Sequence, residues 1–370
     1  MLNQKQNKVL NNINKIGKYN GKDKLLGTKN NDECYTSMQD ILNELCYWGN
    51  LGKFKDKNII CPCDWDIVEG SNIYSITITY DPEYKTESNG VFKTVKKVEY
   101  NLWEDFENNV QIQTIDLKEN EIEDFLRNKL TCNFLRALTQ NSRRWGIKSI
   151  TASGYNPNTN KGIKFQDVDY SKYDICITNP PFSLYSEFMS CLTDKIDFIV
   201  LAPFMNRAAP NVGLYLMRKK AYFGRNAAIG CDFINPIPEN ASKQKGVRCD
   251  WITSFPEAQD ERNIENSKHK FGIDYELYKD EFKEIKSITM KDGTHPIIAD
   301  KRTFPYNYDG WMFVSTSLLH QLDLTKYEWY GTNFKKYFNT THPEKNPCMH
   351  KMSDTMLEGK FHAILIKKIK

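Results

Sequence analysis

The sequence predicts an α/β protein whose core is a parallel sheet. Apolar runs rich in β-branched residues occur at 147–152, 173–178 and 198–202. A stretch with helical spacing, 186–192, separates the last two runs, and another follows at 212–218. Strands separated by helices are typical of parallel sheets, because a crossover connection is needed between parallel neighbours. With 370 residues the chain is long enough for such a core and a smaller second unit.

The first elements follow a polar arm at residues 1–30, which is rich in Asn and Lys and lacks an apolar run. A helix is predicted over 37–48, where apolar residues recur at helical spacing: Met38, Ile41, Leu42, Leu45 and Trp48. The run 58–63 then reads as a buried strand, and Asp64 ends it.

An inserted β-hairpin is predicted within about 67–115. Residues 73–80 alternate with period two, Ser88-Asn89-Gly90 supplies a polar turn, and 91–98 forms the return strand. The sequence pattern is equally consistent with a hairpin that contacts DNA and with one that only covers the sheet. A helix is expected from 121 to 144, ended by Gly146.

Segments 227–234 and 247–254 are expected to form a terminal antiparallel pair of the sheet. Beyond Pro256 the chain becomes charged and rich in Tyr, with few long apolar runs. We therefore expect a catalytic domain over 31–256 and a C-terminal target-recognition region over 257–370.

The charge balance and the cysteine content exclude few classes of protein. The chain has 51 basic and 47 acidic residues, a formal charge of +4, which does not establish a nucleic-acid partner. No run approaches the ~20 apolar residues of a membrane span. With no secretory leader, we expect a cytoplasmic protein whose ten cysteines are mostly thiols. Cys61-Pro62-Cys63 reads as core, and no metal site is expected.

The motif that carries chemistry is a strand, 174–178, that runs into Asn179-Pro180-Pro181-Phe182. Ligands of open α/β sheets bind beyond the carboxyl ends of the strands. An exocyclic amine on an aromatic ring is a poor nucleophile because the ring delocalises its lone pair. The Asn179 side-chain carbonyl and the Pro180 backbone carbonyl can accept its hydrogens. The proline pair stiffens the turn, and Phe182 offers a flat face for a base flipped out of its stack.

Three further positions suit a cofactor. Asp167, upstream of the strand, can accept a hydrogen bond from the adenine amine of a nucleoside cofactor. Taken alone it could equally be a surface turn acid, but its spacing to Asn179 favours the cofactor role. Asp64 can hold an amine or ribose hydroxyls, or else form a turn. Thr36, with Tyr35 before the first helix, can bind a carboxylate at a helix N-terminus or serve only as an N-cap.

At these residues the chain resembles the EcoRI-type adenine-specific DNA methyltransferases, from about Asn31 to the C-terminus. The matching segments are Asn31 to Thr36, Ile59 to Asp64 with Cys63, Ile150 to Tyr155 with Ser153, Asp167, Asn179 to Phe182, and Pro305 to Met312. The resemblance implies a seven-stranded Rossmann-like sheet, S-adenosylmethionine as methyl donor, and a specific duplex DNA site. It also implies a bacterial or phage-encoded restriction–modification or solitary enzyme, with a cognate endonuclease as a candidate partner. Candidate DNA contacts are Arg207, Arg302, Tyr306, Asn307 and Tyr308.

The chain departs from the methyltransferase pattern at two places. Asp64-Trp65-Asp66 stands where a glycine cluster usually follows the first strand. The second strand ends in Ser153-Gly154-Tyr155 instead of the acid that commonly holds the ribose. The residues that would bind the cofactor around Asp64 and Tyr155 therefore match the methyltransferase pattern less well than the catalytic motif does.

Two alternatives remain beside a monomeric DNA adenine N6-methyltransferase. Asn-Pro-Pro-aromatic also suits an RNA adenine or a glutamine amide in a protein, because each presents a weakly nucleophilic NH2 group. The C-terminal region, with Arg, Lys, Tyr and Trp interleaved, favours nucleic acid. A catalytically silent DNA-binding relative is the third reading, and the intact Asn179 to Phe182 argues against it.

Overall fold

The structure is a computed structural model that describes residues 35–64, 73–80, 96–102, 113–117, 133–156, 161–204, 216, 219–234, 243–268, 272–282, 284, 289–290, 293–299, 303–323, 326–330, 338–339 and 363–369. These residues fall into two compact units, each considered by itself. The larger unit holds the described residues of 35–204 and 223–255. The smaller unit holds those of 216–222 and 256–369. The predicted polar arm at 1–30 and most of the predicted helix at 212–218 lie outside the described residues.

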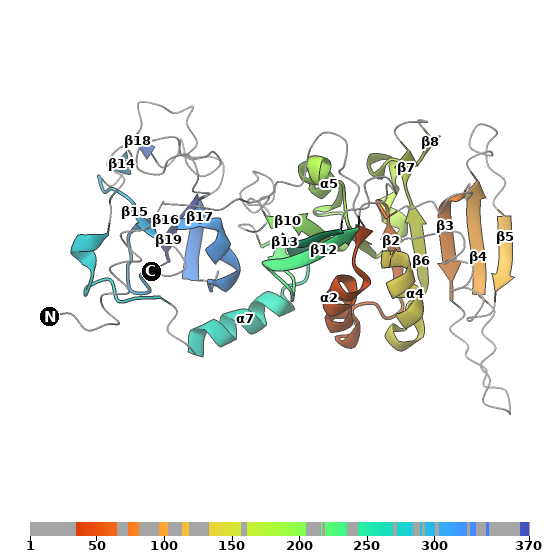
Figure 1. Ribbon diagram of the computed structural model, residues 1–370, viewed down its shortest axis with the longest axis horizontal. Coiled ribbons are helices and arrows are strands. Elements are labelled where there is room, and N and C mark those ends of the chain that lie inside the picture. The colour runs from red at the N-terminus through yellow and green to blue at the C-terminus, as the bar shows by residue number, and fades with distance from the viewer. Residues whose placement is uncertain are drawn as a thin grey trace. The chain divides into compact units, whose positions relative to one another are not determined.

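A mixed sheet forms the core of the larger unit (Figure 1). Its strands follow in space as β1 (Tyr35–Thr36), β12 (Ile229–Ile234), β13 (Lys243–Thr253), β10 (Asp197–Pro203), β9 (Ile175–Thr178), β2 (Asn58–Cys61), β6 (Ser149–Ser153), β3 (Ile73–Thr79), β4 (Lys96–Leu102) and β5 (Gln113–Leu117). The short β11 (Tyr222–Phe223) also pairs with β13. The central strands β10, β9, β2 and β6 are parallel. This confirms the predicted α/β class with a parallel core.

The sheet is larger than the seven strands that the resemblance implied, because both edges are extended. On one side β3 pairs antiparallel with β6, followed by β4 and β5. On the other side β12 and β13 form the predicted antiparallel pair, with a register shift between Cys231 and Phe233, and β1 adds to β12.

The inserted hairpin therefore continues the central sheet. Residues 91–95 of the predicted return strand lie outside the described residues, and β4 continues past the predicted end at Val98 to Leu102. β5 adds a third strand that the sequence pattern did not predict. The buried Ile76 and Ile78 of β3 lie opposite Ala152 and Ile150 of β6. In the described residues, structural cover of the sheet edge thus accounts for the period-two pattern of 73–80.

Helices cover both faces of the sheet. The predicted helix at 37–48 is α2 (Met38–Asn50), and the described part of the predicted helix at 121–144 is α4 (Asn133–Trp145). Gly146 ends α4 with a φ of +65°. Phe134 of α4 packs on Trp251 of β13, with ring centroids 5.9 Å apart. The third helix, α5 (Tyr185–Leu192), is close to Asp250, the neighbour of Trp251 on the same strand. Since neighbouring strand residues point to opposite faces, α5 lies across the sheet from α4.

Helix α2 is fastened to the sheet by a buried carboxylate. Glu44 is fully buried and accepts hydrogen bonds from the Trp48 indole at 2.7 Å, the Arg225 amide at 2.8 Å and the Asn226 amide at 2.7 Å. Burial raises the pKa of Glu44, and these donors partly offset the rise. The contacts fix the loop that leads into β12.

Gly49 sets how closely α2 approaches α4. A Cβ atom at this position would overlap the Trp145 ring. We expect Gly49→Ala to destabilise the protein by about 1–3 kcal/mol in urea unfolding, despite the better helix propensity of alanine. Asn43→Ala, on the exposed side of the same helix, should stay within about 0.5 kcal/mol. Equal stability of the two variants would contradict this packing.

The smaller unit has a separate apolar core. It contains α7 (Glu257–Lys268) and a four-stranded sheet in the order β15 (Ile297–Ala299), β16 (Trp311–Ser315), β19 (Ala363–Lys368) and β17 (Tyr327–Tyr330). A two-stranded sheet pairs β14 (Thr289–Met290) with β18 (Phe338–Asn339). Phe304, Phe313 and Leu319 are among its fully or almost fully buried side chains. Within the described parts of the chain, no helix is both long and apolar enough to cross a bilayer.

Candidate active site

The predicted catalytic motif lies at the carboxyl edge of the parallel strands. β9 ends at Thr178, so Asn179 is the first residue beyond it. Asp64 follows β2 by three residues, and Ser153 is the last residue of β6. Because β9, β2 and β6 are parallel neighbours, their carboxyl ends meet at one edge. The fold thus brings together three polar residues from distant parts of the sequence.

A hydrogen bond joins the motif to the end of β2. The Asn179 backbone N–H donates to Oδ1 of Asp64 across 3.2 Å. Asn179 is half-buried with its Oδ1 atom covered, and Pro180 is buried. Pro181 has a φ of −55°, and its carbonyl accepts from the Leu184 N–H at 3.0 Å. The proline pair therefore leads into a short 3-10 turn, η4 (Phe182–Leu184), as its restricted φ favours.

Phe182 connects the motif to the outer strands of the sheet. Its half-buried ring meets the buried Phe233 ring edge to face, with centroids 6.0 Å apart and planes at 87°. Phe233 of β12 is the register partner of Thr36 on β1. Tyr35 pairs with Ile234 on the same strands. The opening segment predicted to bind the cofactor thus lies on the strand next to the Phe182 contact.

Asp64 is an electrostatically unusual carboxyl group. It is only 8% exposed, and burial raises its pKa from 3.8 to about 7. The Thr178 hydroxyl and the Asn179 N–H partly offset this rise. The Thr178 hydroxyl is close enough to lower the pKa, yet Asp64 Oδ2 makes no hydrogen bond of good geometry with any described residue. A buried acceptor in this state suits a ligand that brings its own N–H or O–H donors.

Two hydroxyl groups of the larger unit, one on β1 and one on β6, are buried as well. Thr36 Oγ1 and Ser153 Oγ are covered and have no hydrogen-bond partner among the described residues. Ser37, not Thr36, caps α2: its Oγ accepts from the Asp40 N–H at 3.2 Å. Buried polar atoms are normally paired, so these two hydroxyls and the carboxyl group fit a polar ligand such as S-adenosylmethionine.

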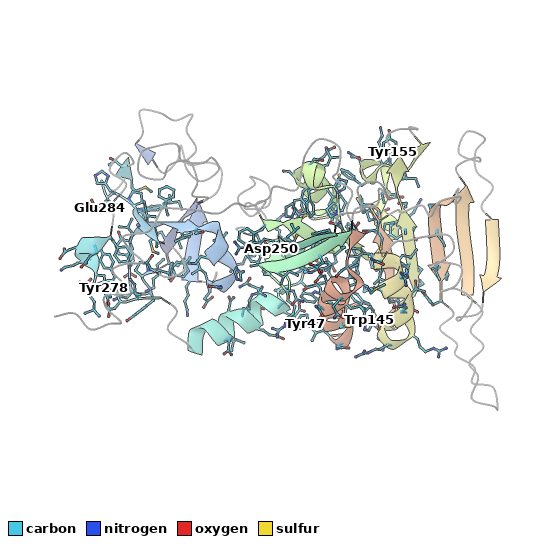
Figure 2. The ribbon with its side chains drawn as sticks, in the orientation of Figure 1. Tyr47, Trp145, Tyr155, Asp250, Tyr278 and Glu284 are labelled. Carbon is cyan, nitrogen blue, oxygen red and sulfur yellow. The ribbon has the colours of Figure 1, made fainter. Side chains whose placement is uncertain are left out.

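Tyr155 and Asp167 lie in the loop region between β6 and β9. Tyr155 begins β7 (Tyr155–Asn156), which pairs with β8 (Lys161–Gly162) in a small hairpin, and Figure 2 labels it. The Lys164 ammonium lies 5.0 Å from the Tyr155 ring centroid. The ring is therefore already in contact with a cation.

Asp167 closes a 3-10 turn, η2 (Phe165–Asp167), and its side chain is exposed. Phe165 of the same turn packs on Phe188 of α5, with ring centroids 5.2 Å apart. The turn is thus anchored to the helix that follows the catalytic motif, while the carboxylate itself faces solvent.

Cys63 is half-buried beside Asp64. Burial raises the pKa of its thiol well above the ordinary value, the nearby Asp64 raises it further, and the Thr178 hydroxyl opposes this. Cys61 and Cys176 are fully buried in the sheet, consistent with the core reading of the cysteine pair. Among the described residues no three His, Cys, Asp or Glu side chains are grouped to hold a metal ion.

The candidate DNA contacts of the smaller unit have internal roles where the structure describes them. Tyr306 OH donates to Asp274 Oδ2 at 3.2 Å, and Asn307 Nδ2 donates to Asp274 Oδ1 at 2.8 Å. The Tyr308 ring contacts the Tyr275 ring, with centroids 4.4 Å apart and planes tilted by 40°. Arg207 and Arg302 lie outside the described residues.

Residues that the sequence pattern missed also lie near the carboxyl edge. Phe233 meets Phe182, and Arg248 on β13 stacks over Phe204, with 4.3 Å between the guanidinium carbon and the ring centroid. Asp250 of β13 lies near the buried Tyr185, which opens α5. Only the register between strands reveals these contacts, since the residues are far apart in sequence.

Comparisons with known proteins identify no family for this chain. No family model matches the sequence, and no curated protein matches it. A search of solved structures finds a proposed RNA methyltransferase from Pyrococcus horikoshii, with a TM-score of 0.28 and 11% identity over 69% of this chain and 98% of that one. A likeness this weak identifies no substrate.

Proposed function

We propose that the protein is an S-adenosylmethionine-dependent methyltransferase of the EcoRI type that methylates N6 of adenine in DNA, acting as a monomer. The single observation that carries this proposal is the junction at the end of β9. There the Asn179-Pro180-Pro181-Phe182 turn is hydrogen-bonded to the buried Asp64 at the carboxyl edge of a parallel sheet. This juxtaposes acceptors for an amine, an aromatic ring and a buried carboxyl group.

The residues of the turn divide the work on the target base. Asn179 Oδ1 and the Pro180 carbonyl accept the two hydrogens of the amine, which favours a tetrahedral, more nucleophilic nitrogen. Phe182 stacks on the flipped adenine, and its edge-to-face contact with Phe233 orients the ring. After transfer, the nitrogen loses a proton to solvent. No strong base is required, because the sulfonium is an excellent leaving group.

The cofactor would be held by the residues whose polar atoms are buried at this edge. Asp64 supplies a carboxyl oxygen, and Thr36 and Ser153 supply hydroxyls. Bound there, S-adenosylmethionine supplies an electrophilic methyl group. Asp64 also holds the Asn179 main chain, so one group positions both the cofactor and the catalytic turn.

Transfer of a tritiated methyl group tests the proposal. In three separate reactions, the protein and labelled S-adenosylmethionine are incubated with unmethylated genomic DNA, with total RNA or with a lysate protein fraction. Label in DNA is expected. Label found only in RNA or only in protein would show that this molecule, and not DNA, is the substrate. No label in any substrate, with DNA binding retained, would indicate a catalytically silent DNA-binding relative. Sequencing of modified bases from an expressing host then defines the recognition site.

Phe182→Ala is expected to weaken capture of the flipped base. Stacking of a base on an aromatic ring contributes about 1–3 kcal/mol, so we expect a KM for DNA roughly 10- to 100-fold higher. Leu184→Ala, an exposed residue of the same turn, is the matched control and should behave like the parent. Cofactor affinity should be unchanged in both variants, and an unaltered KM in Phe182→Ala would remove the ring from base capture.

A further inference from the structure

We propose that Arg248 binds a phosphate of the DNA backbone that flanks the target nucleotide. Arg248 was not among the DNA contacts expected from the sequence, which lie at Arg207, Arg302 and the segment 306–308. The inference rests on the proposed function for the position of the target base. It adds a backbone contact in the larger unit, on the same sheet as the catalytic turn.

Strand register places Arg248 at the catalytic edge. β13 runs antiparallel to β10, and Cys249 is the partner of Pro203, the last residue of β10. Arg248 precedes Cys249, so it lies at the carboxyl edge of the parallel strands. On the other side of β10, Thr178 is the partner of Val200. With ordinary strand spacings, the Arg248 and Asn179 backbones are roughly 14 Å apart, within reach of neighbouring phosphates of one bound strand.

Strand alternation also gives the face of the sheet. Arg248 and Asp250 are two residues apart on β13, so they share a face. Asp250 lies near Tyr185, the first residue of α5, which follows the catalytic turn. Trp251 points to the opposite face and packs on α4. Arg248 is therefore on the α5 side, where the chain leaves Phe182 (Figure 2, where Asp250 is labelled).

The chemistry of the side chain fits a phosphate. Arg248 is exposed, while the Phe204 ring beneath it is only 8% exposed. The cation–π contact holds the guanidinium over the ring, and its N–H donors can still bind a ligand. Their fork geometry matches two phosphate oxygens, and a stacked arginine loses less freedom on binding. Among the described residues, Arg248 forms no ion pair with a carboxylate.

The negative charge around the 306–308 segment of the smaller unit argues against this segment as the sole contact with the DNA phosphate backbone. Asp274 accepts hydrogen bonds from Tyr306 and Asn307. Burial raises the pKa of Tyr275, whose ring contacts Tyr308, and the nearby carboxylates Glu276, Glu284 and Asp280 raise it further. Carboxylates repel phosphates, so this side of the smaller unit is a poor match for DNA. Asp250 shares a face of β13 with Arg248, but it is fully buried and accepts a hydrogen bond from the Ala228 N–H at 2.7 Å.

A second stacked arginine supplies the matched control. The Arg225 guanidinium lies 5.5 Å from the Tyr47 ring centroid, and its side chain is exposed. Asn226, the next residue, accepts from the Trp251 N–H at 3.3 Å, and Arg225 contacts α2, which packs against α4 on the face of the sheet opposite α5. Figure 2 shows Tyr47 at the opposite end of the sheet from Tyr155. Arg225→Gln removes the same charge and the same kind of contact far from the proposed path of DNA.

DNA binding is measured by fluorescence anisotropy with a labelled duplex over a range of salt concentrations. All variants carry Asn179→Ala, so no turnover occurs. Arg248→Gln is expected to raise the Kd about 5- to 10-fold at low salt and to reduce the slope of log K against log salt by about one. Arg225→Gln should match the parent. Arg248→Lys should keep the slope, because it retains the charge.

Unfolding midpoints and cofactor affinity, measured on the same samples, should be unchanged in Arg248→Gln. A parental Kd and slope in Arg248→Gln, or an equal loss in Arg225→Gln, would overturn the inference. An effect seen with an RNA hairpin but not with duplex DNA would overturn the assignment to DNA. If the parent enzyme transfers no methyl group but Arg248→Gln still reduces the slope of log K against log salt, the proposed function is wrong while the phosphate contact is supported.

Discussion

Replacing Asn179 with alanine is expected to lower methyl transfer by at least about 1000-fold and to leave cofactor affinity within about threefold. The variant removes an acceptor aimed at the target amine, and loss of one such preorganised group typically costs 100- to 1000-fold in rate. Loss of the base's orientation adds to this. The backbone N–H that donates to Asp64 is kept, so the cofactor site should survive. Single-turnover transfer and equilibrium cofactor binding measure the two quantities.

Asn141→Ala is the matched control for this variant. The Asn141 amide donates only to the Ala137 carbonyl within α4, at 2.9 Å, away from the carboxyl edge. Its activity should equal that of the parent. Normal turnover in Asn179→Ala would exclude Asn179 from the mechanism. Equal loss of cofactor binding and turnover would instead make it a structural residue of the cofactor site.

Replacing Asp64 with asparagine is expected to weaken cofactor binding about 30- to 100-fold at pH 8. At that pH the Asp64 carboxyl group, whose pKa is about 7, is mostly ionised and accepts hydrogen bonds from the cofactor. A hydrogen bond to a charged group contributes about 1.5–3 kcal/mol, and the amide presents a donor where an acceptor is needed. Calorimetric titration with S-adenosylmethionine measures the change.

The same carboxyl group predicts a pH dependence with opposite signs for binding and stability. Binding should weaken as pH falls through about 7, because protonation removes the charged acceptor. Stability of the free protein should fall as pH rises from about 4 to 7. A pKa raised on folding means that the folded state binds the proton more tightly, and the benefit disappears once the proton leaves. The raised pKa sets an upper limit of about 4 kcal/mol.

Asp64→Asn should flatten both profiles and raise the unfolding midpoint of the free protein at pH 8. Its amide oxygen can still accept from the Asn179 N–H, while the cost of burying a charge is gone. A gain in stability together with a loss of binding is expected of a residue kept for function. A parental pH profile for cofactor binding in Asp64→Asn would show that another group titrates there.

Much of the central fold could be predicted because its signals are local. Helical spacing fixed α2, and apolar runs fixed β2, β9 and β10 to within a few residues. The observed start or end of an element differs from the predicted one where its backbone groups form hydrogen bonds with a neighbouring element. Ile147, for example, was expected to begin a strand, but its N–H donates to the Ser142 carbonyl and completes the end of α4. The strand therefore begins at Ser149.

The edges of the sheet could not be predicted for a different reason. Nothing in the alternation of 73–80 states that its partner is β6, about 70 residues later, since pairing depends on which edge is left open. The predicted turn at Ser88 to Gly90 lies outside the described residues. The return strand was predicted to end at Val98, but pairing with β5 carries β4 on to Leu102.

The candidate site was predictable in its motif and not in its surroundings. Asn179 to Phe182 could be found because a buried strand leads directly into an unusual polar turn. Phe233 and Arg248 reach that edge only through the register of β12 and β13, which a single sequence does not encode locally. The late segment at 306–308 was interpreted by resemblance, and the side chains of Tyr306 and Asn307 donate hydrogen bonds to Asp274.

The most direct test of the central claim is the identity of the methylated nucleoside. DNA incubated with the protein and deuterated S-adenosylmethionine is digested to nucleosides and analysed by mass spectrometry, beside a reaction with Asn179→Ala. The account predicts N6-methyldeoxyadenosine carrying the deuterated methyl group with the parent protein and none with the variant. A label on cytosine, or an equal yield of N6-methyldeoxyadenosine from Asn179→Ala, would contradict it.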